Sequence, residues 1–187
     1  MLHTSYIKYF TGLLLLVTGL LYSCEEEKKK KTKEYTGPLM EVADLHLTYT
    51  DSARLKMILK APLQLKLQSE DEEFPEGMDV LFYDENGEEE GSLTANYSIY
   101  YKEEEKWHLI GNVVLINLQQ EKTLKSEELF WKPDEERIWT DKFVQIITPE
   151  EIITGKGLVA KDDFSEYEIQ EPHGTFDAPK KEKENHN

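Results

Sequence analysis

The sequence of 187 residues contains a single cysteine, Cys24. One thiol cannot form a disulfide within the chain, so the fold has to be stabilised by its core rather than by cross-links. Histidine is also scarce, and no two histidines stand at a spacing typical of a metal site. The sequence has no nucleophile elbow, phosphate-binding glycine loop or EF-hand pattern. We therefore predict that the protein is not an enzyme and binds no cofactor or metal.

Basic residues are outnumbered by acidic ones. The chain has 22 Lys and Arg against 38 Asp and Glu, which gives a formal net charge of −16. Binding to nucleic acid requires a concentrated basic surface. We therefore exclude a nucleic acid partner, while the acidity by itself identifies no other partner.

No apolar run is long enough for a typical membrane span of about 20 residues. The main one, residues 13–21, follows a start whose one firm positive charge is Lys8, and leads into Leu21-Tyr22-Ser23-Cys24. A basic start, a short apolar centre and a small residue before the cleavage point are typical of a secretory signal. The last four residues resemble a bacterial lipobox. We predict a lipoprotein signal peptide at residues 1–23, with an uncleaved anchor over roughly residues 6–22 as the alternative.

Cys24 is then the site of lipidation, and its acyl chains attach the protein to a membrane. Blocks of like charge follow, Glu25–Glu27 and Lys28–Lys31. Such blocks bury no surface, so we predict a flexible tether over residues 24–39. The polar residues 178–187 are predicted to form a disordered tail.

The body of the chain alternates in hydrophobicity. From Leu55 to Leu67 every odd position is apolar. Strict period-two alternation predicts a strand with one buried face, here with Leu59 and Leu65 inward and the lysines toward water. Because Pro62 cannot donate a ladder hydrogen bond, the strand lies at an edge or bends there.

Similar alternation recurs along the rest of the body. It is present at residues 45–49, 93–101 and 107–115, and turn signals separate these runs at residues 84–87, 102–106 and 133–136. Short strands between turns favour a sandwich or roll over alternating strands and helices. We predict one all-β domain over residues 40–177.

Aromatic side chains are numerous for a domain without disulfides. They are Phe82, Tyr83, Tyr97, Tyr100, Tyr101, Trp107, Phe130, Trp131, Trp139, Phe143 and Phe164. An ordinary core explains most of them, but an apolar groove between two sheets explains them as well. Periodicity does not separate a filled core from an open groove, so both remain open.

The order of several short motifs resembles one known family. Residues 74–84 read FPEGMDVLFYD, residues 93–96 read LTAN, and residues 107–113 read WHLIGNV. They resemble corresponding blocks of the LptC family, and ITGKGL at residues 153–158 continues the likeness. The resemblance covers roughly residues 41–176, and it depends on the order of the motifs because each motif is short.

The resemblance implies an open antiparallel β-jelly-roll, or β-taco, in a bridge that carries lipopolysaccharide across the periplasm. Such a domain receives the lipid from the membrane subunits of an ABC transporter and passes it to an LptA-like protein. The implied location is the periplasm, anchored to the inner membrane. This chain departs from the best-known members because it has a lipobox instead of a transmembrane anchor.

A groove for the acyl chains of lipid A would be lined by inward side chains. Assigned by parity, the expected residues are Leu59, Leu65, Phe82, Tyr97, Ile99, Leu109, Val113, Val144 and Ile146. The alternative function is a surface-exposed lipoprotein that acts as a glycan- or protein-binding module. It is motivated by Glu25–Glu27, since an acidic run after the lipidated cysteine resembles a surface-export signal in some Gram-negative lineages.

Overall fold

The computed structural model describes residues 35–177. The predicted signal peptide, Cys24, most of the tether and the C-terminal tail lie outside the described residues. The strands belong to one compact unit that begins at Thr36. They are β1 (Met40–Asp51), β2 (Arg54–Lys66), β3 (Glu72–Phe74), β4 (Met78–Tyr83), β5 (Glu89–Ala95), β6 (Tyr97–Tyr101), β7 (Lys106–Asn117), β8 (Lys122–Lys132), β9 (Arg137–Ile147), β10 (Glu151–Lys161) and β11 (Tyr167–Asp177), with a 3-10 turn, η1 (Pro133–Glu135), before β9. The prediction of an all-β jelly-roll is confirmed.

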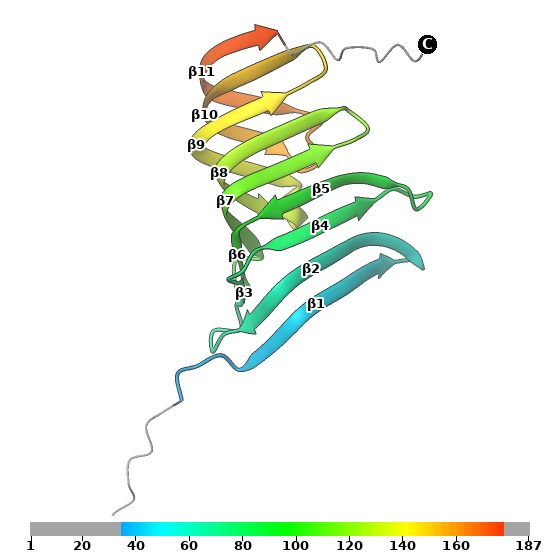
Figure 1. Ribbon diagram of the computed structural model, residues 1–187, viewed down its shortest axis with the longest axis vertical. Coiled ribbons are helices and arrows are strands. Elements are labelled where there is room, and N and C mark those ends of the chain that lie inside the picture. The colour runs from blue at the N-terminus through cyan, green and yellow to red at the C-terminus, as the bar shows by residue number, and fades with distance from the viewer. Residues whose placement is uncertain (1–34, 178–187) are drawn as a thin grey trace, which may run out of the picture. The chain divides into compact units, whose positions relative to one another are not determined.

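The strands form one antiparallel sheet that folds over on itself (Figure 1). Its order is β11-β10-β9-β8-β7-β5-β4-β2-β3-β6, with β1 beside β2 and a further pairing between β6 and β7. The first half of β2 pairs with β4 and its second half with β3. Likewise, the first half of β7 pairs with β6 and its second half with β5. These long strands therefore pass between two layers, which we call layer A (with β4 and β5) and layer B (with β3 and β6).

The long strands bend along a line that we call the spine. In β7 the bend lies at Gly111 and Asn112, whose φ values are 77° and 46°. The pairing with β8 shifts there, between Ile110 and Val113. An extra residue in a left-handed conformation makes a β-bulge, which turns the strand. Glycine adopts this conformation without steric cost and asparagine tolerates it, so the pair suits the bend.

The layers are held together by aliphatic side chains from adjacent strands. At the centre Leu109, Val113, Leu129, Val144 and Leu158 are completely buried. They come from β7, β8, β9 and β10 and belong to one continuous cluster. Each such side chain contributes about 1.5–3 kcal/mol to stability. The roll therefore depends on this cluster, in keeping with a chain that has no internal disulfide.

The described sheet has two edges. β1 pairs only with β2, and β11 pairs only with β10. The turns that join β1 to β2, β4 to β5 and β7 to β8 lie along one side of the fold, away from the spine (Figure 1). Between residues 35 and 177 no helix is long and apolar enough to cross a membrane.

Candidate functional site

A large cavity lies between the layers in the half of the roll that contains β2 and β4. Its volume is about 730 Å³. Layer A contributes apolar side chains including Met57, Leu59 and Val80, and layer B contributes Trp107 and Trp131. The interior is therefore not a filled core throughout, because near β2 and β4 it opens into a chamber. We call this space the chamber.

Aromatic rings form much of the chamber wall. The ring centroids of Trp107 and Trp131 are 6.3 Å apart, and the two ring planes are inclined by 25°. Trp107 also contacts Phe74 at 5.6 Å and Tyr100 at 5.1 Å. From the opposite layer, Phe82 meets Trp131 edge to face at 6.0 Å. Aromatic pairs of this kind contribute about 0.5–1.5 kcal/mol beyond the area they bury, so the contacts among these rings stabilise the wall.

A second cavity of about 380 Å³ continues toward β9 and β10. It shares Phe82 and Trp131 with the chamber. The loop between β10 and β11 contributes Asp162, Asp163 and Phe164 to its wall. The two cavities are thus adjoining parts of one apolar groove, and the loop reaches into the second part.

The rim of the chamber is polar. Asp84 lies in the β4–β5 turn, where its carboxylate accepts hydrogen bonds from the backbone N–H groups of Asn86 at 2.8 Å and Glu88 at 2.9 Å. These bonds, above all the one from Glu88, hold the pKa of Asp84 below its ordinary value. Glu85 and Glu90 also line the chamber. The rim is consequently charged and solvated, whereas the walls are apolar.

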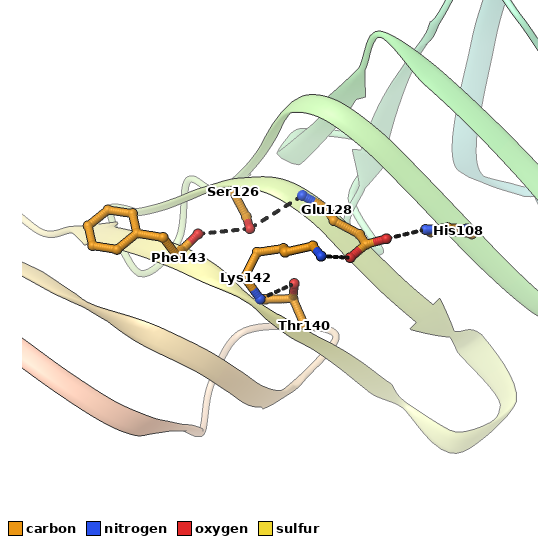
Figure 2. Close-up of polar contacts among 6 residues, drawn as sticks. All are labelled: His108, Ser126, Glu128, Thr140, Lys142 and Phe143. Atoms are coloured by element: carbon orange, nitrogen blue, oxygen red, sulfur yellow. Dashed lines mark hydrogen bonds and ion pairs between the residues drawn. The ribbon is translucent and has the colours of Figure 1, made fainter.

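A separate polar cluster lies at the bend of β7, β8 and β9. Figure 2 shows its members: His108, Ser126, Glu128, Thr140, Lys142 and Phe143. Glu128 lies 2.8 Å from His108 Nε2 and 3.4 Å from Lys142 Nζ. The hydrogen bond with His108 is the main reason that the pKa of Glu128 is lowered. The Ser126 hydroxyl donates to the carbonyl of Phe143 at 3.0 Å, which satisfies a backbone group where the ladder is interrupted. We interpret this cluster as a set of polar contacts that stabilises the bend of the strands at the spine.

Six of the nine residues predicted by parity belong to the interior. Leu59 and Phe82 line the chamber, and Phe82 also lines the second cavity. The other four, Leu109, Val113, Val144 and Ile146, are completely buried in the core cluster.

The parity assignment puts the remaining three residues on the wrong face, although Ile99 is still buried, with 9% of its side chain exposed. Gln64, not Leu65, is the buried neighbour in the second half of β2. In β6, Ser98 pairs with the core residues Phe74 and Leu109. Directly paired residues share a face, so Tyr97 and Ile99 lie on the opposite face, outside the core cluster. There, burial and a hydrogen bond to Glu73 raise the pKa of Tyr97 to about 12.

The spine explains these three corrections. The chain leaves β5 at Ala95, turns at Asn96 and enters layer B as β6. Asn96 donates its backbone N–H to the carbonyl of Gly111 at the bend of β7. A one-residue change of register inverts every side chain beyond it. In β2 the buried face also inverts on passing Pro62, from Leu59 and Ala61 to Gln64, although the pairing with β1 shows no register shift there. Lys66 lies on the same face as the buried Gln64.

One chamber residue was not singled out by the strand pattern. Met57 belongs to the predicted inward face, but Met78 begins β4 directly after the turn at Gly77 and so has no alternation before it. Trp107 and Trp131 were among the conspicuous aromatics. Trp107 shares an alternating run with Leu109, whereas only the fold separates Trp131 from Phe130, which stacks with His108 on the outer face. The number of aromatic residues indicated that an apolar wall could form, but most of the residues in that wall could be identified only from the structure.

No group of three or more His, Cys, Asp or Glu side chains is placed to hold a metal ion in the described part of the chain. No curated protein matches the sequence. A family model described as "Lipopolysaccharide-assembly, LptC-related" matches residues 11–173, which is most of the chain. With the jelly-roll and its groove, this match shows that the chain belongs to the LptC family of lipopolysaccharide-assembly proteins.

Proposed function

We propose that this protein is a membrane-anchored periplasmic component of a lipopolysaccharide export bridge, and that it holds the acyl chains of lipopolysaccharide in its groove. The observation that carries the proposal is the chamber of about 730 Å³ with its wall of tryptophan, phenylalanine and methionine. A protein that carries lipopolysaccharide through the periplasm has to shield its acyl chains from water. The chamber offers that shield.

The chemistry of the groove suits hydrocarbon chains. Acyl chains need no directional partner, and each buried methylene contributes about 0.8 kcal/mol. The chamber supplies apolar walls on both layers, including Met57 and Val80 from layer A and Trp107 from layer B. Its polar groups gather at the rim, where Asp84 is held by backbone N–H groups. We infer that the protein binds and transfers lipid without catalysis.

The sheet edges supply the means of passing the lipid on. An exposed edge accepts a strand from another protein through main-chain hydrogen bonds. Leu47 and Tyr49 of β1 lie opposite Leu59 and Met57, yet they are 42% and 54% exposed. Apolar side chains left open at an edge favour continuation of the groove into a neighbouring domain.

We assign each edge to one partner. Because β1 follows the predicted tether, we assign its edge to the membrane subunits of the ABC transporter. We assign the β11 edge to an LptA-like protein. The anchor would be acylated Cys24 in the inner membrane; this residue lies outside the described part of the chain, and the assignment comes from the lipobox.

The test is photocrosslinking in cells. A photoreactive amino acid in place of Tyr49 or Phe82 should give a lipopolysaccharide adduct while the transporter is active. The same replacement at Lys60, which is exposed on the other face of β2, should give none. Equal labelling at the three positions, or none at the chamber positions, would contradict the proposal.

Protease treatment of intact cells separates this function from that of a surface-exposed binding module. A bridge component is shielded by the outer membrane, so it should be cleaved only after that membrane is permeabilised. Cleavage in intact cells would favour the surface module instead.

A further inference from the structure

The loop between β10 and β11, residues 162–166, forms part of the wall of the second cavity through Asp162, Asp163 and Phe164. On the layer A side, the side-chain amide of Asn117 donates to the carbonyl of Asp163 at 2.7 Å. On the layer B side, the backbone N–H of Asp162 donates to the carbonyl of Glu136 at 3.1 Å. The loop is therefore fastened to both layers, in contrast to the open rim of the chamber. We call this loop the strap.

Phe164 points from the strap into the groove. Its side chain is 1% exposed and belongs to the core cluster. It stacks on Tyr167, with ring centroids 5.2 Å apart. It lines the second cavity with residues of both layers, among them Leu93 and Leu129. The ring therefore occupies space that would otherwise continue the groove toward β10 and β11.

The backbone at Phe164 is strained. Its φ of 56° lies in the left-handed region, which is unfavourable for a bulky residue other than glycine. Such a conformation persists only where surrounding contacts hold it, and here these are the buried ring and a few hydrogen bonds at the rim. Lys122 adds a contact of 3.4 Å from its Nζ to the Phe164 carbonyl. The strap belongs to neither β10 nor β11, so displacing it need not break their ladder, but it does require the buried ring to leave the core.

We propose that the strap is a gate within the groove, with Phe164 as the plug that acyl chains must displace to pass from the chamber to the β11 edge. The inference rests on the proposed function. The two cavities share Phe82 and Trp131, so a chain that leaves the chamber in this direction meets Phe164 next. The strap thereby divides the groove into an open receiving part and a closed delivering part.

The experiment compares lipid at two positions in the purified, folded protein. Tyr49 lines the chamber and Gln120 lines the second cavity. A photoreactive amino acid in place of Tyr49 therefore reports on lipid in the chamber, and one in place of Gln120 reports on lipid in the second cavity. The probe is purified lipopolysaccharide. In the protein with the native strap, most of the lipopolysaccharide adduct should form at the chamber position. Phe164→Ala should raise the ratio of second-cavity to chamber adduct at least fivefold.

Two further variants keep the result interpretable. Asn117→Ala removes the hydrogen bond to the Asp163 carbonyl, together with the one that Asn117 Oδ1 accepts from the Gln120 backbone N–H, and leaves the plug in place, so it should raise the ratio by a smaller factor. Phe143→Ala removes an exposed phenylalanine at the spine and should leave the ratio unchanged. Circular dichroism is used to check that each variant is folded. If Phe164→Ala does not fold, Asn117→Ala alone tests the gate.

The outcomes distinguish the gate from the carrier function. Adducts in the chamber with a ratio that neither strap variant changes would overturn the gate and leave the carrier function standing. No adduct at either position in any folded variant would overturn both. A rise in the ratio for Phe143→Ala equal to that for Phe164→Ala would also overturn the gate, since the change would then be unrelated to the plug.

Discussion

The indole N–H of Trp131 donates a hydrogen bond to the carboxylate of Asp162, with 3.3 Å between Nε1 and Oδ2. The bond joins the chamber wall to the strap. Burial raises the pKa of Asp162, and the indole only partly offsets this effect. A carboxylate at this position is thus an unfavourable element of the folded protein at neutral pH, although it is only about half buried.

We expect Asp162→Asn to stabilise the protein slightly at pH 7. Because the folded state binds the proton of Asp162 more tightly than the unfolded state, the contribution of this group to stability falls as pH rises through the window above 3.8. The amide keeps an acceptor for Trp131 and carries no charge. The gain should be below about 1 kcal/mol because solvent screens the half-exposed group. Urea unfolding at pH 4 and pH 7 would measure it, and a variant that loses stability at pH 7 would contradict the prediction.

The opposite dependence on pH is expected at the spine. Contacts with His108 and Lys142 lower the pKa of Glu128. The stability they contribute is therefore present above about pH 4.5 and is lost as pH falls through the folded pKa. Glu128→Gln should cost about 1 kcal/mol at pH 7 and little at pH 3. Glu127→Gln, at the exposed neighbouring position, is the control, and equal losses for the two variants at pH 7 would count against the network.

The direction in which the side chains of β2 point can be tested by comparing three substitutions to aspartate. Leu59→Asp places an unpaired charge in the core and should cost about 4 kcal/mol or more. Lys60→Asp changes an exposed side chain and should stay within about 0.5 kcal/mol. Leu65→Asp should fall between them, since Leu65 lies beyond the inversion at Pro62. Thermal unfolding of the three variants would measure the order, and a Leu65→Asp loss equal to that of Leu59→Asp would contradict the register.

The sequence was sufficient to predict the strand content and the inward face of several strands. Alternation is a local property, and it assigned the inward face correctly in the first half of β2, as at Leu59, and in the second half of β9, as at Val144 and Ile146. The fold class followed from the number of such runs and the turns between them, and the order of motifs indicated the family. These features depend only on neighbouring residues.

The inversions at the spine were beyond sequence analysis. They depend on how one strand pairs with two partners, and the local signs are weak because Asn96 and Asn112 occur in many contexts. The residue pattern also could not decide between a filled core and an open groove, since a tryptophan that lines a cavity and one that stacks on an outer face look alike in sequence. Trp131 and Trp139 illustrate this: they lie on adjacent strands, and only Trp131 faces the chamber.

The membrane anchor remains a prediction from the lipobox. Cys24→Ala removes the only thiol that can be acylated. The variant should carry no acyl chain and should accumulate as an unprocessed precursor or a soluble protein. Metabolic labelling with an acyl analogue, followed by fractionation of membranes, would measure both effects. Label on the variant equal to that on the native protein would exclude Cys24 as the site.

A charge on the chamber wall tests the carrier function without removing core. Met57 lines the chamber and is only half buried, so Met57→Glu places a carboxylate toward the cavity where water can reach it. Folding should therefore be largely retained, but acyl chains would have to desolvate the charge in order to bind. We expect the affinity for purified lipopolysaccharide to fall about tenfold or more, which corresponds to about 1.4 kcal/mol or more. Lys60→Glu on the opposite face also adds a carboxylate and should leave the affinity within about twofold. If both variants fold and bind as the native protein does, the chamber is not where the lipid is held.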